Sequence, residues 1–191
     1  MSDTKFAICS RAAVSVGCKQ IASFSDGTTE SAVAAEVYDA RVRELLGEHD
    51  WRFAVTTIDL SHLADAPDDP WTHAWQLPAD MVKLLSLYTG GERLTAFEQQ
   101  ADRIVCDVDE NSTLTLTYVQ QKAESFFPPW FTRVLEHQLA ADFAGGVSED
   151  AGMVDLHRRA REQKLMLAKR LDRLQQPARR LPVGRLRAAR R

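Results

Sequence analysis

The spacing of hydrophobic residues along the chain changes twice, from helical to strand-like and back to helical. Residues 5–16 are rich in Ala and Val and predict a short helix. Residues 28–49 predict a second helix, in which either Thr28 or Thr29 caps the first turn. Glu30 then complements the helix dipole. Apolar residues recur here every three or four positions, which indicates one face that packs against other helices.

Residues 51–120 have the pattern of strands instead. Aromatic and β-branched residues dominate 51–58, and strict alternation in 113–119 predicts a strand with one buried face. Turn-forming residues at Gly90-Gly91 and around Asn111 predict two hairpins. The two hairpins span 82–97 and 102–119, and a short edge strand is expected at 71–77.

Helical spacing returns after residue 128. Pro129 suits the first turn of a helix over 129–144, and a long helix of roughly 42 Å is predicted over 149–176. The long helix has one apolar stripe, formed by Met153, Leu156, Ala160, Leu167, Leu171 and Leu174. We therefore expect an α+β domain over residues 1–176, a four-helix bundle built from the N- and C-terminal helices. A small antiparallel sheet of hairpins is inserted between the two pairs of helices.

The charge of the chain is unevenly distributed. The formal net charge is −3, but residues 177–191 contain six Arg and no acid, so the remainder has a charge of −9. An arginine-rich C-terminal tail outside the domain suggests binding to an acidic surface, such as that of a neighbouring copy. Composition alone favours the alternative, a solvated terminus. The overall charge argues against a dedicated DNA-binding domain, which is normally basic throughout.

Residues that commonly act in catalysis or in metal binding form no recognisable motif in this sequence. The histidines are not spaced as HExxH or HxH, and the acidic cluster near residue 65 lacks the spacing and glycine of a calcium loop. Phosphate-binding loops and the GxSxG motif are missing from the sequence. We therefore expect no catalytic residue, no metal site and no cofactor. The residues considered are His49, His62, His73, His137, His157, Asp65, Asp68 and Asp69.

The cysteines and the apolar segments bear on where the protein acts. Cys9, Cys18 and Cys106 have no ligand spacing and are interpreted as small apolar residues in a reducing cytoplasm. No apolar run reaches the roughly 18 residues of a membrane span, and the N-terminus lacks a signal pattern. The sequence thus predicts no membrane partner.

Three stretches resemble a known family when they are taken in order. The first is Ile21–Thr28 with the following Leu45–Ala54, the second is Ala74–Asp80, and the third is Pro128–Phe131 with Leu139 and Ala140 on the helix after it. This order is similar to tail tubular protein A of short-tailed phages, and to related head-to-tail adaptors of other tailed phages and gene transfer agents. The resemblance covers about residues 8–175.

The resemblance implies a structural virion protein and not an enzyme. Adaptors of this family form a ring, typically of twelve copies, that docks under the portal protein, extends the DNA channel and provides the tail attachment site. The implied partners are the portal, the tail proteins, further copies of the chain, and genomic double-stranded DNA that passes without sequence-specific binding. The implied location is the head–tail junction of the virion, assembled in the host cytoplasm.

Two sets of residues are the candidate contact sites of such an adaptor. Gly90, Gly91 and Asn111, at the hairpin tips, are expected to face the tail proteins. The tail arginines are expected to bind the portal or a neighbouring subunit, and they are Arg179, Arg180, Arg185 and Arg187. The alternative is a helical DNA-binding or regulatory protein that uses the arginine tail on phosphates.

Overall fold

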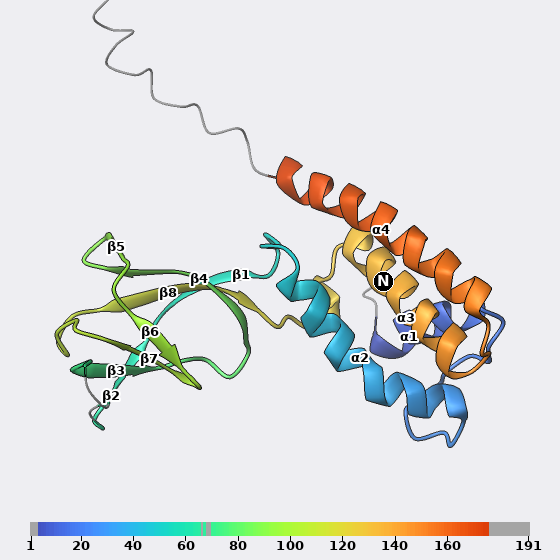
Figure 1. Ribbon diagram of the computed structural model, residues 1–191, viewed down its shortest axis with the longest axis horizontal. Helices are drawn as coiled ribbons and strands as arrows, with labels where there is room; N and C mark the ends of the chain where they lie inside the picture. Colours follow the sequence, from blue (N-terminus) through green and yellow to red (C-terminus); the bar gives the residue numbers. More distant parts are fainter. Residues whose placement is uncertain (1–3, 66, 68–69, 176–191) are drawn as a thin grey trace, which may run out of the picture.

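The computed structural model describes residues 4–65, 67 and 70–175, which form a helical lobe and a β lobe side by side (Figure 1). The helices are α1 (Lys5–Ser15), α2 (Thr29–Gly47), α3 (Pro129–Gly146) and α4 (Ala151–Leu174). The strands are β1 (Val55–Asp59), β2 (Ser61–Leu63), β3 (His73–Gln76), β4 (Met81–Thr89), β5 (Glu92–Leu94), β6 (Glu98–Gln100), β7 (Arg103–Cys106) and β8 (Leu114–Gln120). A 3₁₀ turn, η1 (Glu124–Phe126), precedes α3.

Side-chain caps fix where three of the helices begin. Thr4 accepts a hydrogen bond from the N–H of Ala7 before α1, and Thr28 accepts one from the N–H of Ser31 before α2. Asp150 caps α4 by accepting from two backbone N–H groups of its first turn, so this helix begins two residues later than expected. Each cap accepts a hydrogen bond from a backbone N–H group of the first turn, which has no acceptor within the helix.

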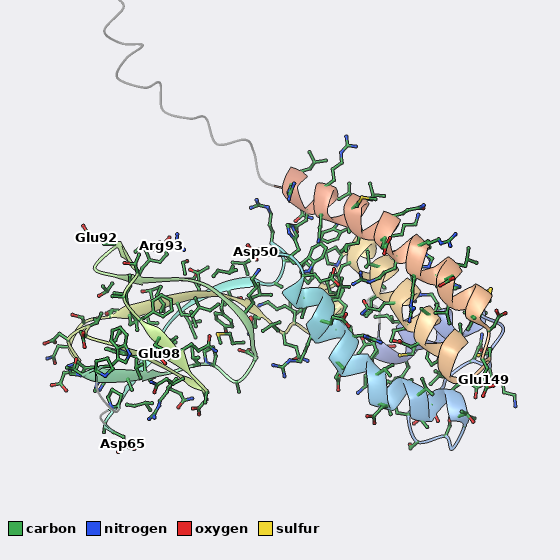
Figure 2. All side chains as sticks on the ribbon, in the orientation of Figure 1. Asp50, Asp65, Glu92, Arg93, Glu98 and Glu149 are labelled. Atoms are coloured by element: carbon green, nitrogen blue, oxygen red, sulfur yellow. The ribbon has the colours of Figure 1, made fainter. Side chains whose placement is uncertain are left out.

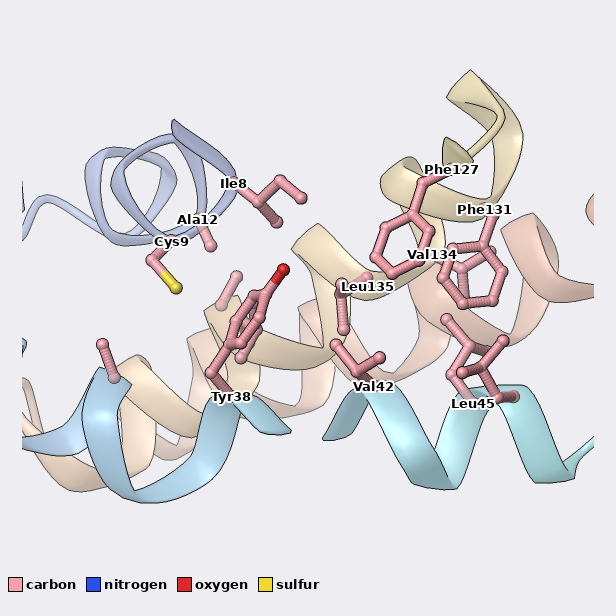
Figure 3. Packing of buried hydrophobic residues seen from close by; sticks show 14 of the residues in the cluster. Ile8, Cys9, Ala12, Tyr38, Val42, Leu45, Phe127, Phe131, Val134 and Leu135 are labelled. Atoms are coloured by element: carbon pink, nitrogen blue, oxygen red, sulfur yellow. The ribbon is translucent and has the colours of Figure 1, made fainter. Parts of the chain in front are cut away.

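Helix α3 is the centre of the helical lobe, because α1, α2 and α4 all pack against it. Figure 3 shows the apolar contacts between these helices, with Tyr38 of α2 lying close to α1. The Tyr38 hydroxyl donates to Glu124 Oε1 at 3.2 Å, and burial raises the pKa of this tyrosine. Burial also raises the pKa of the Cys9 thiol to about 12, so Cys9 acts as an apolar core residue.

An aromatic cluster lies where the two lobes meet. Trp51 stacks on Trp130 with ring centroids 5.4 Å apart, and its edge contacts Phe131 at the same distance. Phe53 contacts Phe127 and Phe131. The Trp51 indole N–H donates to the carbonyl of Leu45, 2.7 Å away, so the ring is buried without an unsatisfied donor. Trp51 and Phe53 lie in a turn before β1, and the strand expected at 51–58 starts only at residue 55.

The β lobe consists of two antiparallel four-stranded sheets, in the orders β1-β8-β4-β5 and β2-β3-β7-β6. Residues from both sheets form a second core, separate from the core of the helical lobe. Its buried members are Trp75, Leu77, Leu87, Ile104, Cys106, Leu114, Leu116 and Tyr118. The chain passes from β1 into β2 with only Leu60 between them, so one extended segment contributes to both sheets.

The expected four-helix bundle with a small hairpin insertion is wrong. The described part of the chain is α+β with four helices and two four-stranded sheets, and the strands have a hydrophobic core of their own. The sequence underestimated the sheets because β2 and β6 are three residues long and mostly polar. Such edge strands have neither the length nor the alternation that marks a strand in sequence.

The strand pairing expected near Asn111 is also wrong. Residues 102–119 do not form a hairpin, because β7 pairs with β3 and β6, whereas β8 pairs with β1 and β4. The turn at 109–112 therefore carries the chain from one sheet to the other. The strand expected at the edge over 71–77 is β3, which lies between β2 and β7. Turn residues predict a reversal of the chain, but they do not specify the strand that follows as a partner.

The hairpin of β4 and β5 agrees with its predicted turn. Thr89 pairs with Glu92, so Gly90 and Gly91 form a two-residue loop, and their φ angles of 57° and 83° suit a type I′ turn. Thr89 also pairs with Leu114, which places this loop and the segment before β8 at the same end of the sheet. The other end of β8 meets the helical core at Val119. Both predicted tips are therefore at the end distant from the helices.

We predict that Trp51→Ala lowers the free energy of unfolding by about 3–5 kcal/mol, because it leaves a cavity at the junction and removes a buried hydrogen bond. Urea unfolding measures this change. Trp71→Ala is the matched control, since Trp71 is only partly buried and its indole bonds to exposed Glu98. An equal loss in both variants would contradict the role of the Trp51 cluster.

Candidate assembly surface on the final helix

The face of α4 that packs on α3 is unusually polar. Its fully buried residues are His157, Ala168 and Asp172, and only Ala168 is apolar. Buried polar groups are costly unless each finds a partner. Hydrogen bonds and ion pairs therefore add to the apolar contacts that Leu165 and Ala168 of α4 make with the helical core.

Asp172 holds the C-terminal part of α4 to the entrance of the β lobe. Its side chain is 1% exposed, and Oδ1 accepts a hydrogen bond from the backbone N–H of Arg52 at 3.0 Å. Nε2 of His49 lies 3.2 Å from Oδ2 of the same carboxylate. One carboxylate thus contacts both sides of the turn that connects α2 to the β lobe.

Arg161 provides a second polar contact, near the middle of α4. Its guanidinium pairs with Glu48 at the end of α2, and Nε donates to Gln138 Oε1 of α3 at 3.3 Å. The Gln138 amide in turn donates to Glu44 at 2.8 Å. The network joins α2, α3 and α4. It gives hydrogen-bond partners to the polar side chains that lie between these helices.

Two histidines meet across the interface of α3 and α4. Nδ1 of His137 lies 3.2 Å from Nδ1 of His157, which is 7% exposed. Burial lowers the pKa of both from the usual 6.5, and the positive charges of His157, Arg133 and Lys164 lower that of His137 further. His157 is therefore buried in the interface, and His137 is partly buried beside it.

Part of the apolar stripe of α4 points away from the core. Leu156, Leu167 and Leu174 are 58%, 48% and 70% exposed, and Met166 beside them is 68% exposed. Leu156 and Leu167 are eleven residues apart and Leu174 follows seven later, spacings that return to one side of a helix. Figure 2 shows side chains projecting outward along the whole length of α4. The expected stripe is thus divided: Met153, Ala160 and Leu171 are partly buried, whereas Leu156, Leu167 and Leu174 are exposed.

Exposed apolar side chains of this size favour association. Burial of one Leu or Met side chain contributes about 1.5–3 kcal/mol relative to leaving it in water. Several such side chains on one side of a helix indicate an interaction site on a soluble protein, although exposed Arg159 and Gln163 separate Leu156 from the other three. We call the surface formed by Leu156, Met166, Leu167 and Leu174 the outer stripe.

The outer stripe lies in a basic environment on an otherwise acidic protein. Residues 151–175 contain seven basic and three acidic side chains, a net charge of +4. Residues 1–150 contain 11 basic and 24 acidic side chains, a net charge of −13. The basic side chains closest to the stripe in sequence include Arg170 and Arg173. A partner that covers the stripe is therefore expected to be acidic at its rim.

A groove lies at the opposite end of α4, between its first turns and the facing parts of α2 and α3. Its volume is about 540 Å³. Val33, Val37, Ala141 and Val154 give it an apolar floor, while Glu36 and Asp142 supply acidic groups. Gly146 contributes to the groove because its missing side chain leaves room beside Val33. Arg158 also lines the groove and Asp142 is paired with Arg41, so the groove is suited to receive an apolar side chain.

The residues proposed from sequence lie elsewhere. Gly90, Gly91 and Asn111 are in the β lobe, whereas Arg179, Arg180, Arg185 and Arg187 lie outside the described residues, as do Asp68 and Asp69. Sequence reasoning did find the apolar residues of α4 but assigned them to the core. The misleading signal was their regular spacing, because an apolar stripe predicts a contact but does not say with what.

No protein-family model matches the chain, and a search of curated proteins finds no match. None of the four helices in the described part of the chain combines the length and apolar content that crossing a lipid bilayer requires.

Lowering the pH should destabilise the contact between α3 and α4. Because the pKa values of His137 and His157 are lowered in the fold, the unfolded chain binds more protons than the folded chain once the pH falls below about 6.5. The free energy of unfolding should therefore be constant above that pH and decrease below it. Urea unfolding at a series of pH values tests this.

The double variant His137→Gln with His157→Gln is expected to show a weaker decrease below pH 6.5. An unchanged pH dependence in that variant would assign the effect to other groups.

Proposed function

We propose that the chain is a structural, non-catalytic subunit of a head-to-tail adaptor ring in a tailed-phage particle or a gene transfer agent. The observation that carries the proposal is the outer stripe of α4, an uncovered apolar surface on a basic helix of an acidic protein. This combination requires a partner surface that is apolar at its centre and acidic around it.

The charge distribution favours a ring over a two-fold dimer. A two-fold contact through α4 would bring a helix of charge +4 against its own copy. A contact between α4 and a different, acidic face of the next subunit joins opposite charges instead. Such a head-to-tail contact leaves one free surface at each end, and it closes when the rotation between neighbours completes a circle. Twelve copies, as in the family resembled, are the proposed number.

The two lobes suit different partners in this arrangement. The helical lobe carries the outer stripe and the start of the arginine tail, so it is proposed to contact neighbouring subunits and the portal protein. The loop at Gly90-Gly91 and the turn containing Asn111 lie at the far end of the β lobe, and they are proposed to meet the tail proteins (Figure 1). The acidic surface would let DNA pass through the channel without being retained, since both carry negative charge.

Replacing two residues of the outer stripe should abolish assembly without affecting folding. Leu167→Ser with Leu174→Ser changes exposed side chains, so the variant is expected to unfold like the wild type. The affinity of the variant for the other subunits of the assembly should fall by about a hundredfold or more, because the burial of two leucines is lost. Native mass spectrometry of the chain mixed with its cognate portal oligomer measures this.

The matched control for the stripe is Val14→Ser, which changes an apolar side chain of α1 that is 50% exposed. The control should assemble like the wild type, with one adaptor per portal subunit. Assembly of both variants with equal affinity would show that the stripe is not the interface.

Deletion of residues 177–191 tests the arginine tail separately. The truncated chain should remain folded, because the described helices and both cores lie before residue 176. Attachment to the portal should be lost, since six Arg are removed from a surface that binds an acidic partner. Normal attachment would assign portal binding to α4 alone.

The DNA-binding alternative rests on one further observation, that the basic charge of the tail continues onto α4. It predicts binding to bare duplex with an affinity that falls steeply as salt increases. Fluorescence anisotropy with a short duplex distinguishes the two functions. A discrete complex with the portal and weak duplex binding supports the adaptor, and the reverse supports the DNA-binding protein.

A further inference from the structure

Two histidines in the β lobe face each other across neighbouring strands. His62 lies on β2 and His73 on β3, which pair so that His62 is opposite Trp75. Nε2 of His62 and Nδ1 of His73 are 3.2 Å apart, and their ring centroids are separated by 5.3 Å. Both rings contact Trp75, which is itself buried, so one side of the pair is held in place.

A carboxylate lies within reach of both imidazoles. Ligand atoms of His62, His73 and Glu110 all lie within 4.8 Å of one another. Glu110 is in the turn that carries the chain between the sheets, and Asp109 fixes this turn by accepting hydrogen bonds from the N–H groups of Asn111 and Ser112, each at 2.9 Å. The Glu110 side chain is exposed, so its carboxylate is free to turn toward the histidines.

The chain positions these three residues through contacts outside the group. Thr72, just before β3, donates from its backbone N–H to Asp107 Oδ1 at 3.2 Å, and its hydroxyl donates to the same oxygen at 3.1 Å. Asp107 follows β7, the strand that leads into the turn of Glu110. The bond therefore holds the start of β3 against the segment before the turn, which keeps His73 close to Glu110.

The distance between the two nitrogens matches that of two ligands on one metal ion. Zn–N bonds of about 2.0–2.1 Å in a tetrahedral site place the two nitrogens about 3.3–3.4 Å apart. Two histidines and one carboxylate are a ligand set that Zn²⁺ accepts, with the fourth position left open. Imidazole ligands also favour Zn²⁺ over Mg²⁺ or Ca²⁺, which prefer oxygen.

We propose that His62, His73 and Glu110 form a binding site for Zn²⁺ in the β lobe. The ion joins β2, β3 and the turn at 109–112, three segments distant in sequence, and it fixes the position of Asn111 next to Glu110. Water or a side chain of a bound partner completes the coordination. The proposal stands independently of the adaptor function.

The other histidine pair does not share these features. His137 and His157 are also 3.2 Å apart, but Arg133 and Lys164 add positive charge around His137, which opposes a cation. Within the described part of the chain, only the group of His62, His73 and Glu110 brings three histidine, cysteine or carboxylate ligand atoms within 4.8 Å of one another. The second pair therefore serves as an internal comparison.

Isothermal titration calorimetry of the tag-free full chain with ZnCl₂ tests the proposal. The expected result is one Zn²⁺ per chain and a higher unfolding temperature when the ion is present. Co²⁺ in place of Zn²⁺ should give visible absorption bands of a site with low coordination number.

Variants of each ligand provide the decisive comparison. His62→Asn, His73→Asn and Glu110→Gln should each weaken Zn²⁺ binding by about tenfold or more, since the loss of even an outer partner of a ligand costs that much. Glu92→Gln is the matched control, an exposed acid at the loop of β4 and β5. It should bind Zn²⁺ like the wild type.

Two results would overturn the proposal. One is a wild-type chain that binds no stoichiometric Zn²⁺, which would leave the two histidines as a hydrogen-bonded pair. The other is binding that persists in both histidine variants but disappears in His137→Gln, which would place the ion between α3 and α4. Circular dichroism of every variant, recorded without metal, shows whether a loss of binding reflects the ligand or the fold.

Discussion

The contact of Trp51 with Trp130 and Phe131 is the constraint on which the arrangement of the molecule depends. The chain enters the β lobe at residues 51–54 and leaves it at residues 120–128, and the aromatic rings from both crossings pack together. Each lobe has its own core, but this cluster belongs to the core of the helices. The β lobe is therefore held by its two connections, by Val119 at the end of β8, and by Val82 and Leu85 of β4, which pack against the helical core.

Helix α4 departs from the usual pattern of a surface helix, in which apolar side chains are buried and polar ones are exposed. Polar groups such as His157 and Asp172 are buried, and Leu156 and Leu174 are exposed. A helix with its leucines inside would bury more apolar surface in the isolated chain. The observed orientation leaves that surface exposed, while the hydrogen bonds of Arg161 and Asp172 fix the helix in one position.

The sequence predicted the positions of the four helices because their caps and apolar spacing are local signals. Thr28 and Pro129 mark their helices in the sequence as they do in the structure. The two sheets could not be predicted in the same way, since β6 is short and polar and β8 finds its partners far along the chain. The pairing of His62 with His73 was likewise invisible, because residues eleven apart become neighbours only once β2 and β3 are aligned.

The hydrogen bond between Asp172 and the backbone of Arg52 gives the molecule a mechanical property. The last turn of α4 is linked through one carboxylate to the first residues of the β lobe, although they are 120 positions apart in sequence. A load applied to the end of α4 therefore has two routes into the rest of the molecule, one through this hydrogen bond to the turn before β1 and one through the packing of α4 on α3.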